Sequence, residues 1–142
     1  MTYPSTQYSE ISERLMYFDF SKGLERFAGN EDTYIRILRF YSLIISALIE
    51  TIKELRYENL PELADKLLGI KQACRSICAQ DIENRAEALE KAARNKNTGF
   101  INIYCNSLLE DAWNLVFEIN ETLYKMRLTN TERGKPVQDC IN

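Results

Sequence analysis

The sequence predicts an all-α protein, and more narrowly an antiparallel up-down-up-down four-helix bundle with one or two short N-terminal helices capping one end. Three observations lead to this fold class. The 142 residues include only five glycines and three prolines, which are too few for the many turns of a strand-rich fold. Apolar residues recur at spacings of three and four along four long segments. The connections between these segments are short, which favours antiparallel neighbours.

The chain has the length of one ordinary domain and can bury a hydrophobic core without stabilisation by metal ions or disulfide bonds. We expect a partly helical N-terminal extension over residues 1–17, a helical bundle over residues 18–129, and a flexible C-terminal tail over residues 130–142. The tail lacks apolar periodicity and contains Gly134 and Pro136. This division places all four long helices in one domain.

Two short helices are expected ahead of the long ones. Residues 8–16 are compatible with the first, and residues 21–27 with the second. The second helix is predicted to start at Ser21 and to stop at Gly29, since serine is a good N-cap and glycine a common helix terminator.

The first long helix is predicted between residues 30 and 56. Asn30 is its N-cap candidate, and Glu31 and Asp32 place negative charge on the first turn, where the helix dipole favours it. Its apolar stripe is widened by two isoleucines on one side. The stripe comprises Tyr34, Leu38, Tyr41, Ile45, Leu48, Ile52 and Leu55, with Ile37 and Ile44 beside them.

The second long helix is predicted to have Pro61 in its first turn, where the missing N–H costs no hydrogen bond, and to run to about Cys78. A third helix is expected from about Gln80 to the polar stretch 94–97. The predicted buried positions are Leu60, Leu63, Leu67, Ile70, Cys74 and Ile77 in the second helix, and Ile82, Ala86, Leu89 and Ala93 in the third.

The fourth long helix is predicted from Thr98 onward. Trp113 and Phe117 lie beside its apolar stripe. The stripe continues for nearly thirty residues and comprises Ile101, Cys105, Leu108, Ala112, Leu115, Ile119 and Met126.

Composition and motifs exclude several classes of function. The net charge of −3 gives no overall field that would attract nucleic acid, and no apolar run approaches the roughly 18 to 20 residues needed to span a bilayer. We therefore expect a cytoplasmic protein without nucleic-acid or membrane partners. The four cysteines are expected to be free thiols, with Cys74 and Cys105 acting as small hydrophobes.

Catalytic motifs are also missing from the sequence. The chain contains no histidine, so a di-iron site with Glu-x-x-His pairs and the usual imidazole-dependent hydrolases do not fit. The five glycines are scattered singly and form no phosphate-binding loop. We expect no metal, no cofactor and no enzymatic activity, because no constellation supports an enzyme using Asp, Glu or Cys.

One apolar residue departs from the helical pattern. On a helical wheel of the second long helix, Leu68 projects about 130° from the centre of the buried stripe and should face outward. Isolated exposed leucines are common, and a neighbouring helix would also account for this one. Its neighbours on the outward side are Ala64, Asp65, Lys71, Gln72 and Arg75, which would make a small apolar spot with basic residues nearby.

The run from Leu68 to Ala79, Leu-Gly-Ile-Lys-Gln-Ala-Cys-Arg-Ser-Ile-Cys-Ala, resembles the motif His-x-Leu-Lys-Gly-x-Ala-x-x-Ile-Gly-Ala of the histidine phosphotransfer (HPt) domains of bacterial phosphorelays. Residues 18–30 are similar to the opening segment of that family, in which an Asp precedes a short Gly-Leu helix and a Gly-Asp turn begins the next helix. The resemblance covers about residues 19–117 and implies the HPt-like four-helix fold.

The departures from the family motif are informative. Leu68 takes the place of the phosphoaccepting histidine, Gln72 that of a glycine that lets the partner approach, and Cys78 that of a helix-ending glycine; Cys74 replaces a small residue. Leucine has no nucleophilic atom, so the resemblance implies a degenerate member that cannot accept phosphate. Lys71, which in the family helps to position the phosphoryl group, is retained.

Two functions remain open at this stage. The first is a non-catalytic pseudo-HPt signalling protein that binds a response-regulator receiver or a histidine-kinase domain as an adaptor or inhibitor. The second is a structural or oligomerising helical bundle unrelated to phosphorelay, for which a homodimer is one form. The partner-binding face expected for the first function comprises Ala64, Asp65, Leu68, Lys71, Gln72 and Arg75, with Leu68 and Ala64 as its apolar centre.

Overall fold

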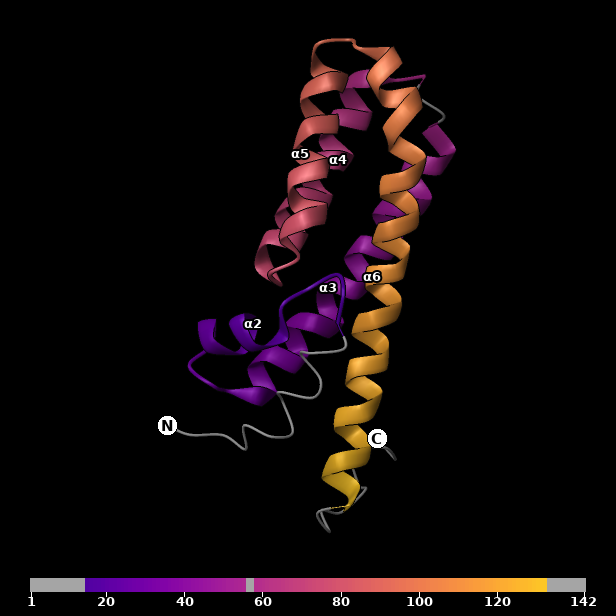
Figure 1. Cartoon of the computed structure of the whole chain (residues 1–142). Helices are drawn as coiled ribbons and strands as arrows, with labels where there is room; N and C mark the ends of the chain where they lie inside the picture. Colours follow the sequence, from indigo (N-terminus) through magenta and orange to yellow (C-terminus); the bar gives the residue numbers. More distant parts are fainter. Residues whose placement is uncertain (1–14, 56–57, 133–142) are drawn as a thin grey trace.

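The computed structural model describes residues 15–55 and 58–132, with side-chain surroundings given as far as residue 127. These residues form helices and contain no strand, which confirms the all-α prediction for this part of the chain (Figure 1). The helices are α2 (Phe20–Arg26), α3 (Glu31–Leu55), α4 (Leu60–Ser76), α5 (Gln80–Arg94) and α6 (Thr98–Glu132).

Two predicted segments lie wholly or mostly outside this range. Of the helix predicted over residues 8–16, only the last two residues are described, and they are not helical. The tail was expected from residue 130, but α6 continues to Glu132, and residues 133–142 lie outside the described residues.

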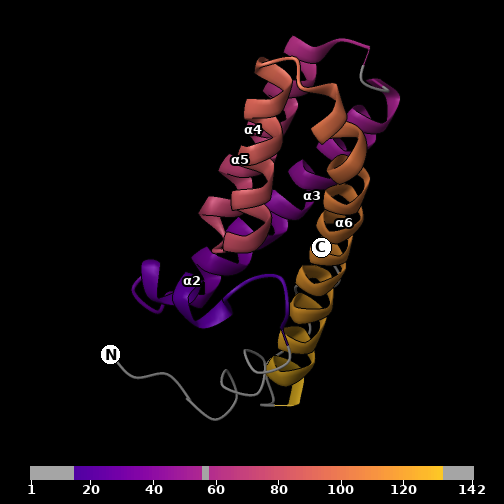
Figure 2. The same ribbon diagram turned by 45° about the horizontal axis from the view of Figure 1, so that its top comes forward.

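The four long helices contact one another in a closed ring. Helix α3 packs against α4 and α6, and α5 packs against the same two helices, while α2 rests on α3. Figures 1 and 2 both show α4 and α5 side by side, with the longer α6 extending past their ends. No helix within the described ranges combines the length and apolar character that a bilayer crossing requires.

Side-chain caps explain where three of the helices begin. The Asp19 carboxylate accepts the Lys22 N–H at 3.0 Å, so the N-cap of α2 is Asp19 and the prediction of Ser21 was wrong. Asn30 accepts the Thr33 N–H at 3.1 Å, as predicted for the start of α3. Asn59 accepts the Glu62 N–H at 3.2 Å and precedes the turn that contains Pro61.

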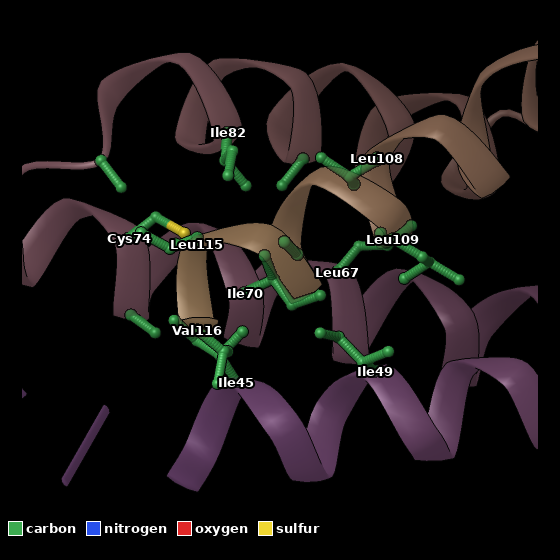
Figure 3. Packing of buried hydrophobic residues seen from close by; sticks show 14 of the residues in the cluster. Ile45, Ile49, Leu67, Ile70, Cys74, Ile82, Leu108, Leu109, Leu115 and Val116 are labelled. Atoms are coloured by element: carbon green, nitrogen blue, oxygen red, sulfur yellow. The ribbon is translucent and has the colours of Figure 1, made fainter. Parts of the chain in front are cut away.

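The apolar stripes of the long helices meet in one core (Figure 3). Every residue of the predicted α6 stripe is buried, as are the predicted α5 positions and all predicted α4 positions except Leu60, which is partly buried. In α3 the buried face is rotated slightly from the predicted stripe. Ile49 is fully buried, while Tyr41, Leu48 and Leu55 are only partly buried. Cys74 and Cys105 are fully buried in the core, as predicted for cysteines that act as small hydrophobes.

The α2 helix closes one end of the core around the Tyr34 ring. This ring packs edge-on against Phe20 at 5.2 Å between centroids and stacks on Phe27 at 5.8 Å. Gly23 lies directly beneath the phenol, where a Cβ atom would collide with the ring. The Asp19 N–H donates to the Cys78 carbonyl at 3.0 Å, so α2 is tied to the turn between α4 and α5.

Candidate functional site

The outer face of α4 carries four of the six residues predicted to bind a partner. Asp65, Gln72 and Arg75 are exposed, and Leu68 is partly buried. These positions are spaced by three and four residues, so they follow one side of the helix. The wheel therefore placed Leu68 on the correct side of α4, although its side chain is less exposed than expected.

Ala64 does not belong to this face. Its exposure is 0%, and it forms part of the core. The reason is that α5 packs along that flank of α4, so the buried arc is wider than the leucine and isoleucine stripe indicated. An alanine permits this close approach of the two helices, and the prediction of Ala64 as a surface anchor was wrong.

Lys71 faces α5 instead of the solvent. Its Nζ atom lies 3.4 Å from Oε1 of Glu87 and 3.4 Å from Oε1 of Glu90, and its side chain is only 17% exposed. The hydrogen bond from Lys71 lowers the pKa of Glu87 below its ordinary value, and Lys91 adds to this effect. The charge of Lys71 is therefore used within the protein, where it joins α4 to α5.

The other charged residues around Leu68 are also paired with α5. Nε of Arg75 lies 2.8 Å from a Glu83 carboxylate oxygen, and an Asp65 oxygen lies 3.3 Å from the Arg94 guanidinium. The hydrogen bond to Glu83 raises the pKa of Arg75. The Arg75 side chain remains 61% exposed, so it is the basic group on this face that is best placed to contact a partner.

On its other flank α4 approaches α3 closely. A Cβ atom at Gly69 would lie 3.1 Å from a Leu48 methyl carbon, so the leucine occupies the space that the glycine leaves. The outer face of α4 is thus a strip bordered by α5 on one flank and α3 on the other. A partner that covered it would contact Leu68, Gln72 and Arg75 first.

Metal-binding clusters and reactive thiols are not found near this strip in the described part of the chain. The described part of the chain contains no cluster of three or more His, Cys, Asp or Glu side chains that could hold a metal ion. Burial raises the pKa of the nearby Cys74 to about 12 and also raises that of Cys78, which disfavours their thiolate forms. The side chains on the strip are an apolar group (Leu68), an amide (Gln72), a carboxylate (Asp65) and a guanidinium (Arg75).

A second set of exposed residues, on α3 and α6, was missed by the sequence analysis. It consists of the large apolar side chains that the described helices leave exposed. Trp113 and Phe117 were expected beside the core stripe, but they are 46% and 65% exposed. A helical wheel of α3 and α6, like the one that singled out Leu68, would have placed several of these side chains outside the apolar stripes. The exposed side chains are Phe40 and Leu43 on α3, and Ile103, Tyr104, Trp113, Phe117 and Tyr124 on α6.

Comparisons of the chain with models of known protein families, with curated proteins and with solved structures found no match. Membership of the HPt family, which the resemblance of residues 68–79 to its motif implies, therefore remains a prediction from the sequence.

Proposed function

We propose that this chain is a pseudo-HPt signalling protein that binds a receiver or histidine-kinase domain in the cytoplasm without transferring phosphate. In this proposal the four long helices form the antiparallel up-down-up-down bundle of the HPt family, and the ring of helix contacts is compatible with it. The observation that carries the proposal is the place of Leu68. It occupies the motif position of the phosphoaccepting histidine and lies on the outer face of α4 beside exposed Gln72 and Arg75.

Two features of the chain support this proposal. No histidine occurs in the 142 residues, so the chain has no imidazole to accept a phosphoryl group at any position. Cys78, which stands where the family motif has a glycine, has a φ of 63°, a left-handed conformation that glycine adopts most readily. The backbone at this position thus has the geometry that the family sequence implies.

The proposed interface differs from the six residues predicted at first. Leu68 forms its apolar centre, with Gln72 and Arg75 on the rim, while Ala64 lies in the core. Lys71 acts indirectly, since its ion pairs to Glu87 and Glu90 hold α5 in place. The resemblance implies that a receiver presents an acidic pocket rimmed by apolar residues, which Arg75 and Leu68 complement.

The test is calorimetric titration of the full chain with receiver and histidine-kinase domains from the same cell. We expect saturable binding by the wild type, and Leu68→Glu should abolish it because a carboxylate replaces the apolar centre. Since Leu68 is partly buried, a second variant is needed. Gln72→Glu changes an exposed residue and should weaken binding by repelling an acidic pocket while leaving the unfolding transition unchanged.

Asn120→Asp is the matched control, because it adds the same charge at an exposed position on α6. Absence of binding to every domain tried, or equal weakening by Gln72→Glu and Asn120→Asp, would contradict the proposal. Incubation with a phosphodonor is a separate test, in which we expect no acid-labile phosphate on the protein.

The alternative function, an oligomerising helical protein outside phosphorelay, is favoured by a different observation. Large apolar side chains are exposed on α3 and α6, whereas none of comparable exposure is found on α4 or α5. These two functions use different surfaces and are therefore separable by mutation.

A further inference from the structure

The outer side of α3 has the residue spacing of a helix–helix interface, although nothing within the described part of the molecule covers it. We call this line of residues the α3 seam; it consists of Arg36, Phe40, Leu43, Ala47, Glu50 and Glu54. All six residues are exposed, with Phe40 at 53% and Leu43 at 68%. Their spacing alternates between four and three, which is the repeat by which one helix packs along another.

Charge is distributed unequally along this seam. The bases Arg36 and Arg39 lie toward its N-terminal end, after the exposed acid Asp32. The acids Glu50 and Glu54 lie at its C-terminal end, with the exposed base Lys53 between them, so the two ends carry net charges of opposite sign. No ion pair between described residues includes any of these side chains. Glu50 and Glu54 are four residues apart on one helix, an arrangement in which like charges repel. A partner that supplied bases to this end would relieve that repulsion.

The charge pattern of the α3 seam is complementary to the same seam running in the opposite direction. In an antiparallel pair of α3 helices related by a two-fold axis at the level of residue 45, two residues that face each other have numbers that add up to about 90. Arg36 then faces Glu54 of the second copy, and Leu43 faces Ala47 of the second copy. Phe40 faces Glu50 of the second copy, whose carboxylate lies within reach of Arg39. The basic end of each seam thus faces the acidic end of the other copy, and Leu43 and Ala47 form the apolar centre between them.

We infer that the chain forms a two-fold symmetric homodimer through the outer face of α3, with the two α3 helices antiparallel. A second copy fits this seam better than an unrelated helix does, because the base-to-acid gradient and the apolar centre match their own reversal. A parallel pair would instead place Arg36 against Arg36 and Glu54 against Glu54.

Sedimentation velocity of the full chain from about 1 µM to about 1 mM tests the inference. The wild type should pass from monomer to dimer with rising concentration. Leu43→Glu should raise the dissociation constant at least about 100-fold, because each dimer would hold two carboxylates at its apolar centre. Ile103→Glu is the matched control, since Ile103 is an equally exposed apolar residue on α6 at 69% exposure, and it should leave the equilibrium unchanged.

A charge exchange tests the antiparallel arrangement. Arg36→Glu should weaken the dimer about tenfold, since two ion pairs become two repulsive pairs. Adding Glu54→Arg to Arg36→Glu should restore the wild-type equilibrium, because each base again faces an acid of the other copy. Circular dichroism should show the same helix content in all variants, as these side chains are exposed.

A chain that stays monomeric throughout this range overturns the inference. A dimer that survives Leu43→Glu, or that responds equally to Ile103→Glu, uses another face and overturns it as well. Failure of the charge exchange to restore dimerisation rules out the antiparallel pair. Because the α3 seam shares no residue with the α4 strip, none of these results decides whether a receiver domain binds.

Discussion

On the α4–α5 side of the molecule, the charged side chains pair with one another, whereas on the α3–α6 side apolar side chains are left exposed. The ion pairs between described residues all include α4 or α5, and none includes α3. The large apolar side chains exposed in the described helices lie on α3 and α6. The first side therefore stabilises its own helix pair, and the second retains apolar area that an external partner can cover.

The largest difference between the two sides should appear when the same residue is changed in the same way on each. Ala64 of α4 is fully buried and Ala47 of α3 is exposed. Ala64→Glu should lower the free energy of unfolding by about 4 kcal/mol or more, because a carboxylate enters the interface between α4 and α5. Ala47→Glu should change it by less than about 0.5 kcal/mol.

Urea unfolding at low protein concentration, where the chain is monomeric, measures both variants. If Ala64→Glu were tolerated as well as Ala47→Glu, the burial of Ala64 against α5 would be wrong, and Ala64 would return to the partner-binding face.

A smaller difference is expected when one base is removed from each side. Lys71→Met should lower the free energy of unfolding by about 1 to 2 kcal/mol, since Lys71 bridges Glu87 and Glu90 in a mostly covered position. Arg39→Met should have an effect within about 0.5 kcal/mol, because Arg39 is exposed and forms no ion pair with a described residue. Thermal unfolding followed by circular dichroism compares the two, and equal effects would argue against a distinct role for the α4–α5 ion pairs.

Acid should act on the α4–α5 side through Glu87. The pKa of this carboxyl in the folded protein lies below its ordinary value of 4.5, chiefly because Lys71 donates a hydrogen bond to it. The stabilisation from Glu87 is therefore complete above that ordinary value and is lost as pH falls below it toward the folded pKa. The difference in unfolding free energy between wild type and Glu87→Gln should shrink over this window.

Urea titrations from pH 7 to about pH 3 measure that difference. A difference that stays constant across the range would show that Lys71 does not hold Glu87 in its charged form.

The smallest effect on stability is expected on the α3–α6 side. Leu43→Ser and Phe117→Ser should each change the free energy of unfolding by less than about 0.5 kcal/mol, because both side chains are mostly exposed. Both should reduce binding of a dye that fluoresces on apolar protein surfaces. Unchanged dye binding would mean that these residues do not form the accessible apolar surface assigned to them.

Regular spacing in the sequence predicted much of the fold. The α6 stripe from Ile101 to Met126 is buried at every predicted position, because a long helix presents residues three and four apart to the same neighbour. Asn30 and Pro61 also marked helix starts correctly, since capping depends on local backbone chemistry. These features are properties of a single helix and its own residues.

The candidate site was less predictable, because its residues lie at the edges of a helix face. Ala64 is compatible with either a surface or a core position, and the packing of α5 decided for the core. The charge of Lys71 is compatible with a partner-binding surface and also with an ion pair inside the protein. It pairs with two glutamates, sixteen and nineteen residues further along the chain. Neither partner could be identified from the spacing within α4.

The sequence by itself determined that the protein is helical, which leucines and isoleucines form most of the core, and that no histidine is present for phosphate chemistry. Only the tertiary structure decided which flank of α4 is covered, which charges are paired, and which apolar side chains of α3 and α6 remain exposed. Periodicity reports the direction of a side chain from its own helix axis. What lies in that direction depends on neighbours that are distant in the chain.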